Sequence, residues 1–149
     1  TLAVLDGGRI GIGALSVGLA RAAFEEAVKY AQERHTFGVP IAQHQAIQFK
    51  LAEMERRVQC SRLLLHKAAW LRDMGQPYTR AASMAKLYAS EAATWVTHQA
   101  IQVHGALGVT DDTILSYWYR HERAARIYDG ADEVHKTSLG RRLMRQYAS

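Results

Sequence analysis

The breaks in its helical pattern constrain the fold of this chain more than any other feature. The sequence has two prolines, Pro40 and Pro77, and each follows a glycine by two positions in a short gap. Proline cannot continue a helix, and glycine commonly ends one. Between the gaps, apolar residues recur every three or four positions, which is the spacing of one face of an α-helix. The pattern predicts helices at about residues 6–34, 44–74, 78–104, 113–125 and 132–144.

The third of these tracts indicates how the helices pack. Apolar residues cover most of its circumference, and many of them are alanine. Small residues permit close approach, so we expect residues 78–104 in the middle of a bundle. The aromatic residues Tyr117, Trp118 and Tyr119 are interpreted as packing residues rather than as residues with a chemical role. With short connections and 149 residues in a single domain, the sequence predicts an all-α antiparallel bundle of four main helices plus a short C-terminal helix.

Charge and histidine spacing argue against two classes of partner. The formal net charge is +5, but the basic residues are scattered, and no helix face combines a basic stripe with stacking aromatic residues. Nucleic-acid binding is therefore not expected. The basic residues include Lys86; most of them are interpreted as solvated helix faces, and an anionic ligand such as a nucleotide or coenzyme A phosphate fits them equally well. The seven histidines lack metal-ligand spacing, so no metal site is expected.

The sequence also bears on the compartment. Cys60 is the single cysteine, which excludes an internal disulfide and fits a reducing, intracellular setting. No apolar run approaches the length of a membrane span, and no signal peptide is visible. We expect an intracellular protein of the bacterial cytoplasm or the mitochondrial matrix. Because the chain begins at Thr1 in a helix-entry pattern, we interpret it as a cut-out domain or a processed piece.

One polar gap, at residues 126–131, carries a candidate for acid–base chemistry. Asp129 lies beside Gly130, which can adopt backbone angles that other residues avoid. Asp132 is predicted to cap the following helix, with Glu133 in its first turn, just as Asp6 is predicted to cap the first helix. A carboxylate on a turn at the edge of a helical core is well placed for proton transfer. The alternative is a plain helix-loop-helix connection, in which Asp129 and Asp132 only cap the helix and stabilise the turn.

Three segments, taken together, resemble a known family. They are Arg34-His-Thr-Phe-Gly-Val-Pro-Ile-x-x-His-Gln45, Gln102-Val-His-Gly-Ala-Leu-Gly108 and Ile127-Tyr-Asp-Gly-x-x-Glu-Val-His135. In order and spacing they resemble the C-terminal bundle of the flavin-dependent acyl-CoA dehydrogenases, and the match runs from Leu5 to about Leu143. The third segment resembles the motif that carries the family's catalytic base.

The resemblance implies a site shared with domains outside this chain. The whole enzyme has an N-terminal helical domain and a middle β domain, and residues 1–149 correspond to the C-terminal bundle. FAD lies between the middle domain and the bundle, and its adenosine diphosphate end reaches a neighbouring subunit. The implied FAD contacts are Arg34, Thr36, Phe37, His44, Gln45, Gln102, Val103, His104, Gly105, Ala106, Ala131 and Glu133. The implied acyl-CoA contacts are Asp6, Arg9 and Gly130.

The same resemblance assigns the catalytic role to Asp129, which removes the proton α to the thioester carbonyl while flavin N5 accepts hydride from the β carbon. The chain departs from the family pattern in having aspartate where glutamate is usual, as in a subgroup of the family. Some relatives carry the base before the arginine of the first helix, but that residue is Gly8 here. Ala131 replaces a flavin-contacting threonine, and Ala106 replaces a glycine.

The function that the resemblance implies is α,β-desaturation of an acyl-CoA thioester in lipid metabolism. An electron-transfer flavoprotein or a similar acceptor would reoxidise the flavin, and the protein would be a homotetramer built as a dimer of dimers. The isolated domain is expected to be inactive. Two alternatives remain open: a related flavin oxidase of acyl-CoA or nitroalkane, and a non-catalytic helical oligomerisation domain.

Overall fold

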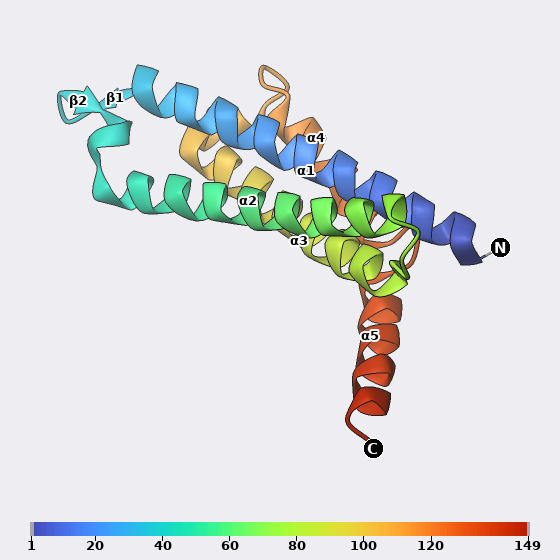
Figure 1. The fold of residues 1–149 in the computed structure, drawn as a ribbon. Helices are drawn as coiled ribbons and strands as arrows, with labels where there is room; N and C mark the ends of the chain where they lie inside the picture. The colour runs from blue at the N-terminus through green and yellow to red at the C-terminus, as the bar shows by residue number, and fades with distance from the viewer. Residues whose placement is uncertain (1, 149) are drawn as a thin grey trace.

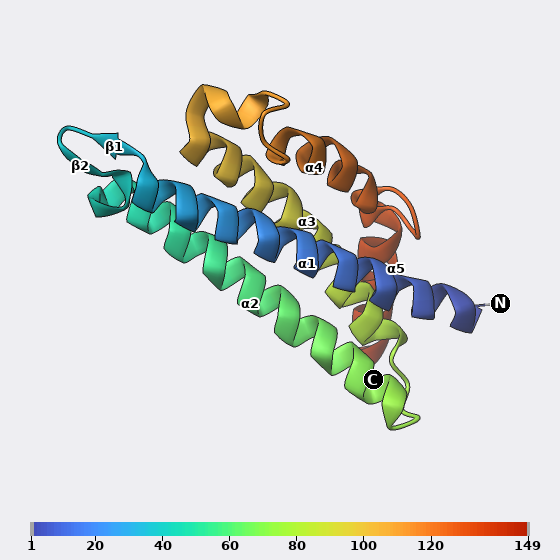
Figure 2. The same cartoon turned by 90° about the horizontal axis from the view of Figure 1, so that it is seen from above.

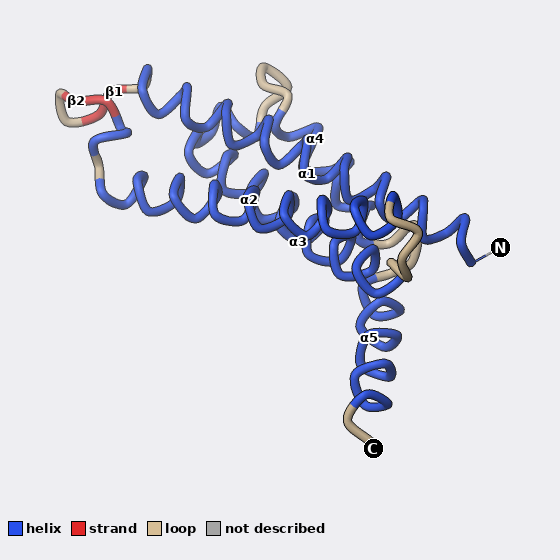
Figure 3. The backbone as a smooth tube through the Cα atoms, in the orientation of Figure 1, coloured by secondary structure: helices blue, strands red, loops and turns tan. Residues whose placement is uncertain are grey.

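The computed structural model describes residues 2–148 and is almost entirely helical (Figures 1 and 3). Its elements in chain order are α1 (Leu2–Glu33), β1 (His35–Thr36), β2 (Val39–Pro40), the 3-10 turn η1 (Ile41–Gln43), α2 (Gln45–Asp73), α3 (Thr79–His104), η2 (Gly105–Val109), α4 (Leu115–Glu122), η3 (Arg123–Arg126) and α5 (Asp132–Gln146). The predicted all-α bundle is confirmed.

Three long helices form the bundle, and α4 lies along it (Figure 2). The contact of α1 with α3 is the most extensive in the structure, and α2 packs against both. The last helix, α5, leaves the bundle at a steep angle and ends away from it (Figure 1). The β1–β2 hairpin and α5 thus lie at opposite ends of the bundle.

Alanine forms the seam between α1 and α3. Four alanines spaced three or four residues apart along α1 are fully buried and belong to the same core cluster as small residues of α3. Because alanine has no side chain beyond Cβ, two helices lined with it can approach closely. Larger apolar residues of α2, chiefly Met54 and Val58, close the core on the third side. The predicted central position of α3 is confirmed. The seam and its neighbours comprise Ala20, Ala23, Ala27, Ala31, Ala93, Val96 and Ala100.

The segment predicted as a loop between the first two helices contains a small hairpin. His35 pairs with Pro40 and Thr36 with Val39. The two residues between the strands, Phe37 and Gly38, both have positive φ, at 53° and 82°. A two-residue hairpin loop with two positive φ values matches the twist of its strands. The sequence pattern anticipates only the extended geometry of the residue before Pro40.

Two predicted helix boundaries are wrong. The first helix begins at Leu2 rather than at Asp6, so Asp6 lies inside α1 and does not cap it. The fourth helix is shorter than predicted, because α4 ends at Glu122 and the chain continues as the tighter turn η3. Among the predicted packing aromatics, Trp118 packs against the core and Tyr117 is half exposed. No helix within residues 2–148 is long and apolar enough to cross a membrane.

Candidate functional site

The carboxylate singled out by the sequence lies on a strained turn. Asp129 has φ of 52°, and Gly130, which follows it, has φ of 97°. Positive φ is uncommon for a residue with a side chain and is tolerated best by glycine and by Asn or Asp. The sharp turn predicted at Gly130 is therefore confirmed, and it extends to Asp129. The turn joins η3 to α5 and leaves Asp129 partly exposed.

The N-cap predicted for the last helix is wrong. Ala131 occupies the cap position, and no side chain caps the helix there. Asp132 is the first residue of α5, is buried, and accepts a hydrogen bond of 2.7 Å from Arg126 Nε. Its negative charge at the start of α5 also complements the helix dipole. The hydrogen bond from Arg126 to Asp132 thus links the end of η3 to the start of α5, on either side of Asp129.

The turn packs against the first helix at Gly8. A Cβ placed on Gly8 would lie 3.5 Å from Asp129 Oδ1 and 3.6 Å from Oδ2. Because Gly8 has no side chain, the Asp129 carboxylate fits against α1. The predicted substrate residues lie within one turn of this contact. Arg9 forms an ion pair of 2.6 Å with Asp6, which also accepts a hydrogen bond of 2.5 Å from Thr79 of α3.

Two residues that the sequence analysis does not single out lie directly beneath the turn. Lys86 of α3 is fully buried, and its Nζ donates a hydrogen bond of 2.7 Å to the carbonyl oxygen of Gly130. Lys86 is thus an exception to the interpretation of most basic residues as solvated helix faces. His135 of α5 is also buried, and its Nε2 lies 2.8 Å from the position of a Cβ on Gly130. Burial lowers the pKa of His135, and the charges of Arg9 and Lys86 lower it further, whereas hydrogen bonding to the backbone of Asp129 and Gly130 raises it.

A buried carboxyl group completes this polar cluster. Glu122, at the end of α4, is 1% exposed and accepts a hydrogen bond from the Ser16 hydroxyl of α1. Burial raises the pKa of Glu122, an effect opposed by the Ser16 hydrogen bond and by the positive charges of His121 and Lys86. Burial likewise lowers the pKa of Lys86, whereas the carboxylates of Asp132 and Asp129 raise it. The turn therefore rests on a group of mutually interacting charges.

The residues predicted to contact FAD gather mostly at the other end of the bundle. At the hairpin, Arg34 is exposed, and the Thr36 hydroxyl is 2.9 Å from His44 Nε2. The Phe37 ring is 98% exposed and lies edge-on to the His44 ring. The α3–η2 junction reaches the same end, where the His104 ring stacks on Tyr30 of α1 at a centroid distance of 4.2 Å.

Within the segment 102–106, the side chains divide into two groups. Those of Gln102 and Ala106 are exposed, and Gly105 has φ of 61°, which glycine adopts readily. Those of Val103 and His104 are buried in the bundle, so these two residues can offer a ligand only their backbone. Gln45 is exposed beside His44 at the start of α2. Ala131 and Glu133 lie instead beside the Asp129 turn.

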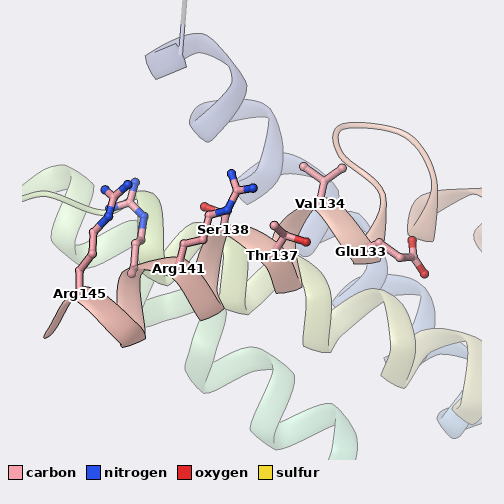
Figure 4. Close-up of a pocket in the computed structure, with 7 residues that line it drawn as sticks. Glu133, Val134, Thr137, Ser138, Arg141 and Arg145 are labelled. Atoms are coloured by element: carbon pink, nitrogen blue, oxygen red, sulfur yellow. The ribbon is translucent and has the colours of Figure 1, made fainter. Parts of the chain in front are cut away.

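A separate hollow of about 570 Å³ lies on the outer face of α5 (Figure 4). It is lined by Glu133, Val134, Thr137, Ser138, Arg141, Arg142 and Arg145. The three arginines make it basic, and every lining residue comes from α5. Among residues 2–148, no cluster of three or more His, Cys, Asp or Glu side chains could hold a metal ion.

Comparison with known proteins gives consistent matches over nearly the whole chain. Residues 1–144 match the family described as "Acyl-CoA dehydrogenase, C-terminal domain". The chain is 45% identical over 145 residues to the short-chain specific mitochondrial acyl-CoA dehydrogenase of Rattus norvegicus, covering 97% of this chain and 35% of that enzyme. It is 43% identical to the acryloyl-CoA reductase (NADH) of Anaerotignum propionicum, covering 95% of this chain and 36% of the reductase.

Solved structures give the same result. The butyryl-CoA dehydrogenase of Megasphaera elsdenii superposes with a TM-score of 0.93 at 39% identity, over 95% of this chain and 37% of that one. The chain therefore spans little more than a third of the length of the proteins that it matches.

The geometry of the turn predicts opposite effects for two glycine substitutions. Gly130→Ala places a methyl group 2.8 Å from the buried His135 ring at a φ of 97°, so we expect a loss of roughly 1–3 kcal/mol in folding free energy. Gly140→Ala, in the helix α5 that follows the turn, meets nothing within 4 Å and should gain about 0.4–1 kcal/mol. Thermal unfolding of the intact protein measures both. Equal effects of the two substitutions would contradict the strained turn.

The buried Glu122 predicts a pH-dependent change in stability. Because its folded-state pKa is raised above the ordinary value of 4.5, the folded state loses stability as the pH rises from about that value through the raised pKa. Glu122→Gln removes this loss, so we expect a higher unfolding temperature than that of the native protein at pH 8 and little difference at pH 4.

Glu53 is the matched control, because its pKa is lowered to about 2 by Arg56 and Arg57. Its contribution has the opposite sign, being present above pH 4.5 and lost as the pH falls toward 2. Glu53→Gln should therefore lower the unfolding temperature slightly at pH 8. A stabilising effect of both substitutions at that pH would show that the Glu122 result reflects the loss of a carboxylate in general rather than its burial.

Proposed function

This chain belongs to the acyl-CoA dehydrogenase family, and we propose that it is the base-bearing bundle of an FAD-dependent acyl-CoA dehydrogenase. In this proposal residues 1–149 form the C-terminal domain, preceded by a helical domain and a β domain. The observation that carries the proposal is the placement of the Asp129 carboxylate, which lies on a strained turn against Gly8 of α1. Strained backbone persists where the surrounding structure over-determines it, and such positions concentrate at functional sites.

The reaction needs one group to remove a proton and another to accept a hydride. Asp129 would take the proton from the carbon α to the thioester carbonyl, and the electron pair of that C–H bond would form the new double bond. FAD, when bound, would accept the hydride that leaves the β carbon at its N5. A side chain that takes a proton from carbon must lie within contact of that carbon and be ionised beforehand. Asp129 is partly exposed, so a substrate could approach its carboxylate, which supports this role.

The residues at the hairpin end fit the adenosine diphosphate part of FAD. Arginine suits phosphate oxygens, and Arg34 is exposed. The Phe37 ring, almost fully exposed, offers an aromatic face to a base. Thr36, His44, Gln45 and Gln102 supply hydrogen-bonding groups nearby. Gly105 and Ala106 present a backbone with little side chain, so a ligand can approach it closely.

The length of α1 determines how these groups can serve one flavin. Gly8 and Glu33 lie 25 residues apart on one helix, which is about 38 Å at 1.5 Å per residue. That span is longer than an extended FAD molecule, so one flavin cannot contact both the Asp129 turn and the hairpin of one chain. We infer that each flavin is shared by two copies, with the turn from one and the hairpin from the other. A dimer, or a tetramer built as a dimer of dimers, supplies this arrangement.

The remaining partners follow from the same proposal. Asp6, Arg9 and Gly130 would border the acyl-CoA site, since Asp6 and Arg9 lie within one turn of Gly8, which packs against Asp129, and Gly130 follows Asp129. The electron acceptor would be an electron-transfer flavoprotein or a similar protein. The similarity to a mitochondrial enzyme and the single cysteine support the mitochondrial matrix or a bacterial cytoplasm as the compartment.

A second candidate is the reverse reaction. The chain is nearly as similar to an acryloyl-CoA reductase as to a dehydrogenase, and saturation of the double bond makes and breaks the same bonds. In that direction Asp129 would return the proton to the α carbon. Comparing flavin reduction by saturated thioesters with reoxidation by α,β-unsaturated thioesters separates the two directions. Rapid reaction of the reduced flavin with oxygen would instead indicate an oxidase.

The decisive substitution is Asp129→Asn in the full-length protein. The amide is almost isosteric but cannot accept the proton, so anaerobic flavin bleaching by butyryl-, octanoyl- and palmitoyl-CoA should fall by at least about a thousandfold, while FAD remains bound. Stopped-flow absorbance of the flavin measures the rate. Bleaching at the native rate would exclude Asp129 as the base.

The position of Gly8 allows a more demanding version of this experiment. A glutamate carboxylate reaches from its Cβ about as far as the 3.5 Å that separates a Gly8 Cβ from Asp129 Oδ1. Gly8→Glu combined with Asp129→Gly should therefore regain a measurable part of the bleaching rate, because glycine also suits the positive φ at position 129. The single variant Asp129→Gly is the control, and it should stay inactive. No recovery in a double variant that binds FAD would show that the reacting carbon does not lie between these two positions.

A further inference from the structure

The turn that carries Asp129 depends on contacts from outside itself. Two successive residues, Asp129 and Gly130, have positive φ, and the turn is joined to helical segments on both sides. A side chain at positive φ carries a conformational cost that neighbouring contacts must offset. These backbone angles set the direction in which the Asp129 side chain leaves the chain, so a contact that fixes the turn also limits where the carboxylate can lie.

Lys86 provides the contact from α3. Its side chain is fully buried, and Nζ donates to the Gly130 carbonyl oxygen at 2.7 Å. Hydrogen bonds from a charged donor are shorter and stronger than those between neutral groups. A lysine is rarely buried completely, because removing its charge from water is costly. A fully buried lysine with its ammonium on the carbonyl next to the base is a specific arrangement rather than general packing.

His135 provides the contact from α5. Its ring lies so close to Gly130 that a Cβ there would be 2.8 Å from Nε2. Among residues 2–148, no group hydrogen-bonds to this nitrogen. The ring packs against the glycine, and the backbone of Asp129 and Gly130 interacts with it electrostatically, while Lys86 holds the carbonyl. Gly130 is fixed at two points that belong to two different helices.

The charges around Lys86 are arranged to keep it in place. Asp129 and Asp132 at the turn and Glu122 of α4 all favour its charged form, and Arg9 of α1 disfavours it. Arg9 is itself paired with Asp6, which reduces its repulsion. Asp132 also bonds to Arg126, so the negative charges facing Lys86 are held by other parts of the site.

We propose that Lys86 is a positioning residue for the base, and that its hydrogen bond to the Gly130 carbonyl holds the Asp129 carboxylate in the direction needed to remove the α proton. The proposal rests on the proposed function, because it takes Asp129 to be the base. Lys86 acts through the backbone and does not exchange a proton with the substrate. Its removal should therefore slow the reduction step without weakening substrate binding.

The test uses the full-length protein with Lys86→Met, which keeps the length of the side chain and removes the donor. Lys136→Met is the matched control, because Lys136 is an exposed lysine on α5 that pairs with Glu91 at 3.2 Å. The probe is whichever of butyryl-, octanoyl- and palmitoyl-CoA bleaches the native flavin fastest. The limiting rate of bleaching and the thioester concentration that gives half of that rate are measured separately.

We expect Lys86→Met to lower the limiting rate about 10- to 100-fold, since a misplacement on the order of 1 Å costs this much in a positioned reaction. The half-saturating concentration should change by less than about twofold, because interactions made only in the transition state affect the rate alone. Lys136→Met should match the native protein in both quantities. A limiting rate equal to the native rate in a Lys86→Met protein that binds FAD would overturn the proposal.

Hydrogen–deuterium exchange tests the same contact without reference to catalysis. The amides of Ile127 and Tyr128 bond to the Ala124 carbonyl beside the turn, so peptides covering 127–131 report on its opening. In Lys86→Met these peptides should exchange faster, while peptides from the α1–α3 seam keep the native rate. Faster exchange throughout the bundle, with a parallel loss of FAD and of thioester binding, would assign Lys86 a purely structural role.

Two further outcomes complete the test. If Lys86→Met does not fold, Lys86→Gln makes the smaller change, because its amide keeps an N–H donor; failure of both to fold overturns the positioning role in favour of a structural one. Asp129→Asn distinguishes the two proposals. Bleaching that survives in Asp129→Asn means that the proposed function fails, whereas bleaching lost in Asp129→Asn but unchanged in Lys86→Met means that only the Lys86 inference fails.

Discussion

The close approach of α1 and α3 is the constraint on which the rest of the structure depends. The alanine seam brings the two helix backbones together, and this approach sets Gly8 of α1 and Lys86 of α3 on the same side of the bundle. The chain between α4 and α5 then crosses the space between them and makes its turn there. Larger residues in the seam would separate the helices and remove both contacts of the turn. The packing of the core and the geometry of the candidate site thus depend on the same contact between α1 and α3.

Burial of charge is the second feature of this site. Lys86, Glu122, Asp132 and His135 are all nearly inaccessible to water, although three of them are ionisable groups that folding normally leaves at the surface. Such a cluster contributes little net stability, because desolvation offsets the attraction between the charges. Its value lies in geometry, since each charged group has few alternative positions once its partners are buried. Buried neighbours of this kind can hold a turn with two positive φ values in one conformation.

The two ends of the bundle perform different parts of the proposed reaction. In the proposed function, the Asp129 turn would face the reacting carbon, and the hairpin end would hold the dinucleotide. The rigid helices between them fix the spacing at a value that one flavin cannot span within a single chain. Assembly of copies is therefore a geometric requirement of the proposed function. The α5 helix leaves the bundle at a steep angle (Figure 1), and the arginines that line its hollow lie outside the core.

The sequence by itself determined the helices and the position of the candidate base. Glycine and proline punctuation located the breaks to within a few residues, because these two residues act on the backbone locally. The motif around Asp129 could be recognised because its residues are adjacent in the chain. The hairpin at Phe37 and Gly38 was missed, because phenylalanine rarely adopts positive φ and its presence does not predict such a turn. The cap of α5 was also missed, because the residue there is Ala131, which has no capping side chain. Only the tertiary structure decided which charges are buried. Lys86 lies in an apolar helix that the sequence places in the middle of the bundle, but nothing within that segment shows what accepts the hydrogen bond of its buried ammonium. Its partner, the Gly130 carbonyl, is 44 residues away in the chain, and contacts at that separation exist only once the helices have packed.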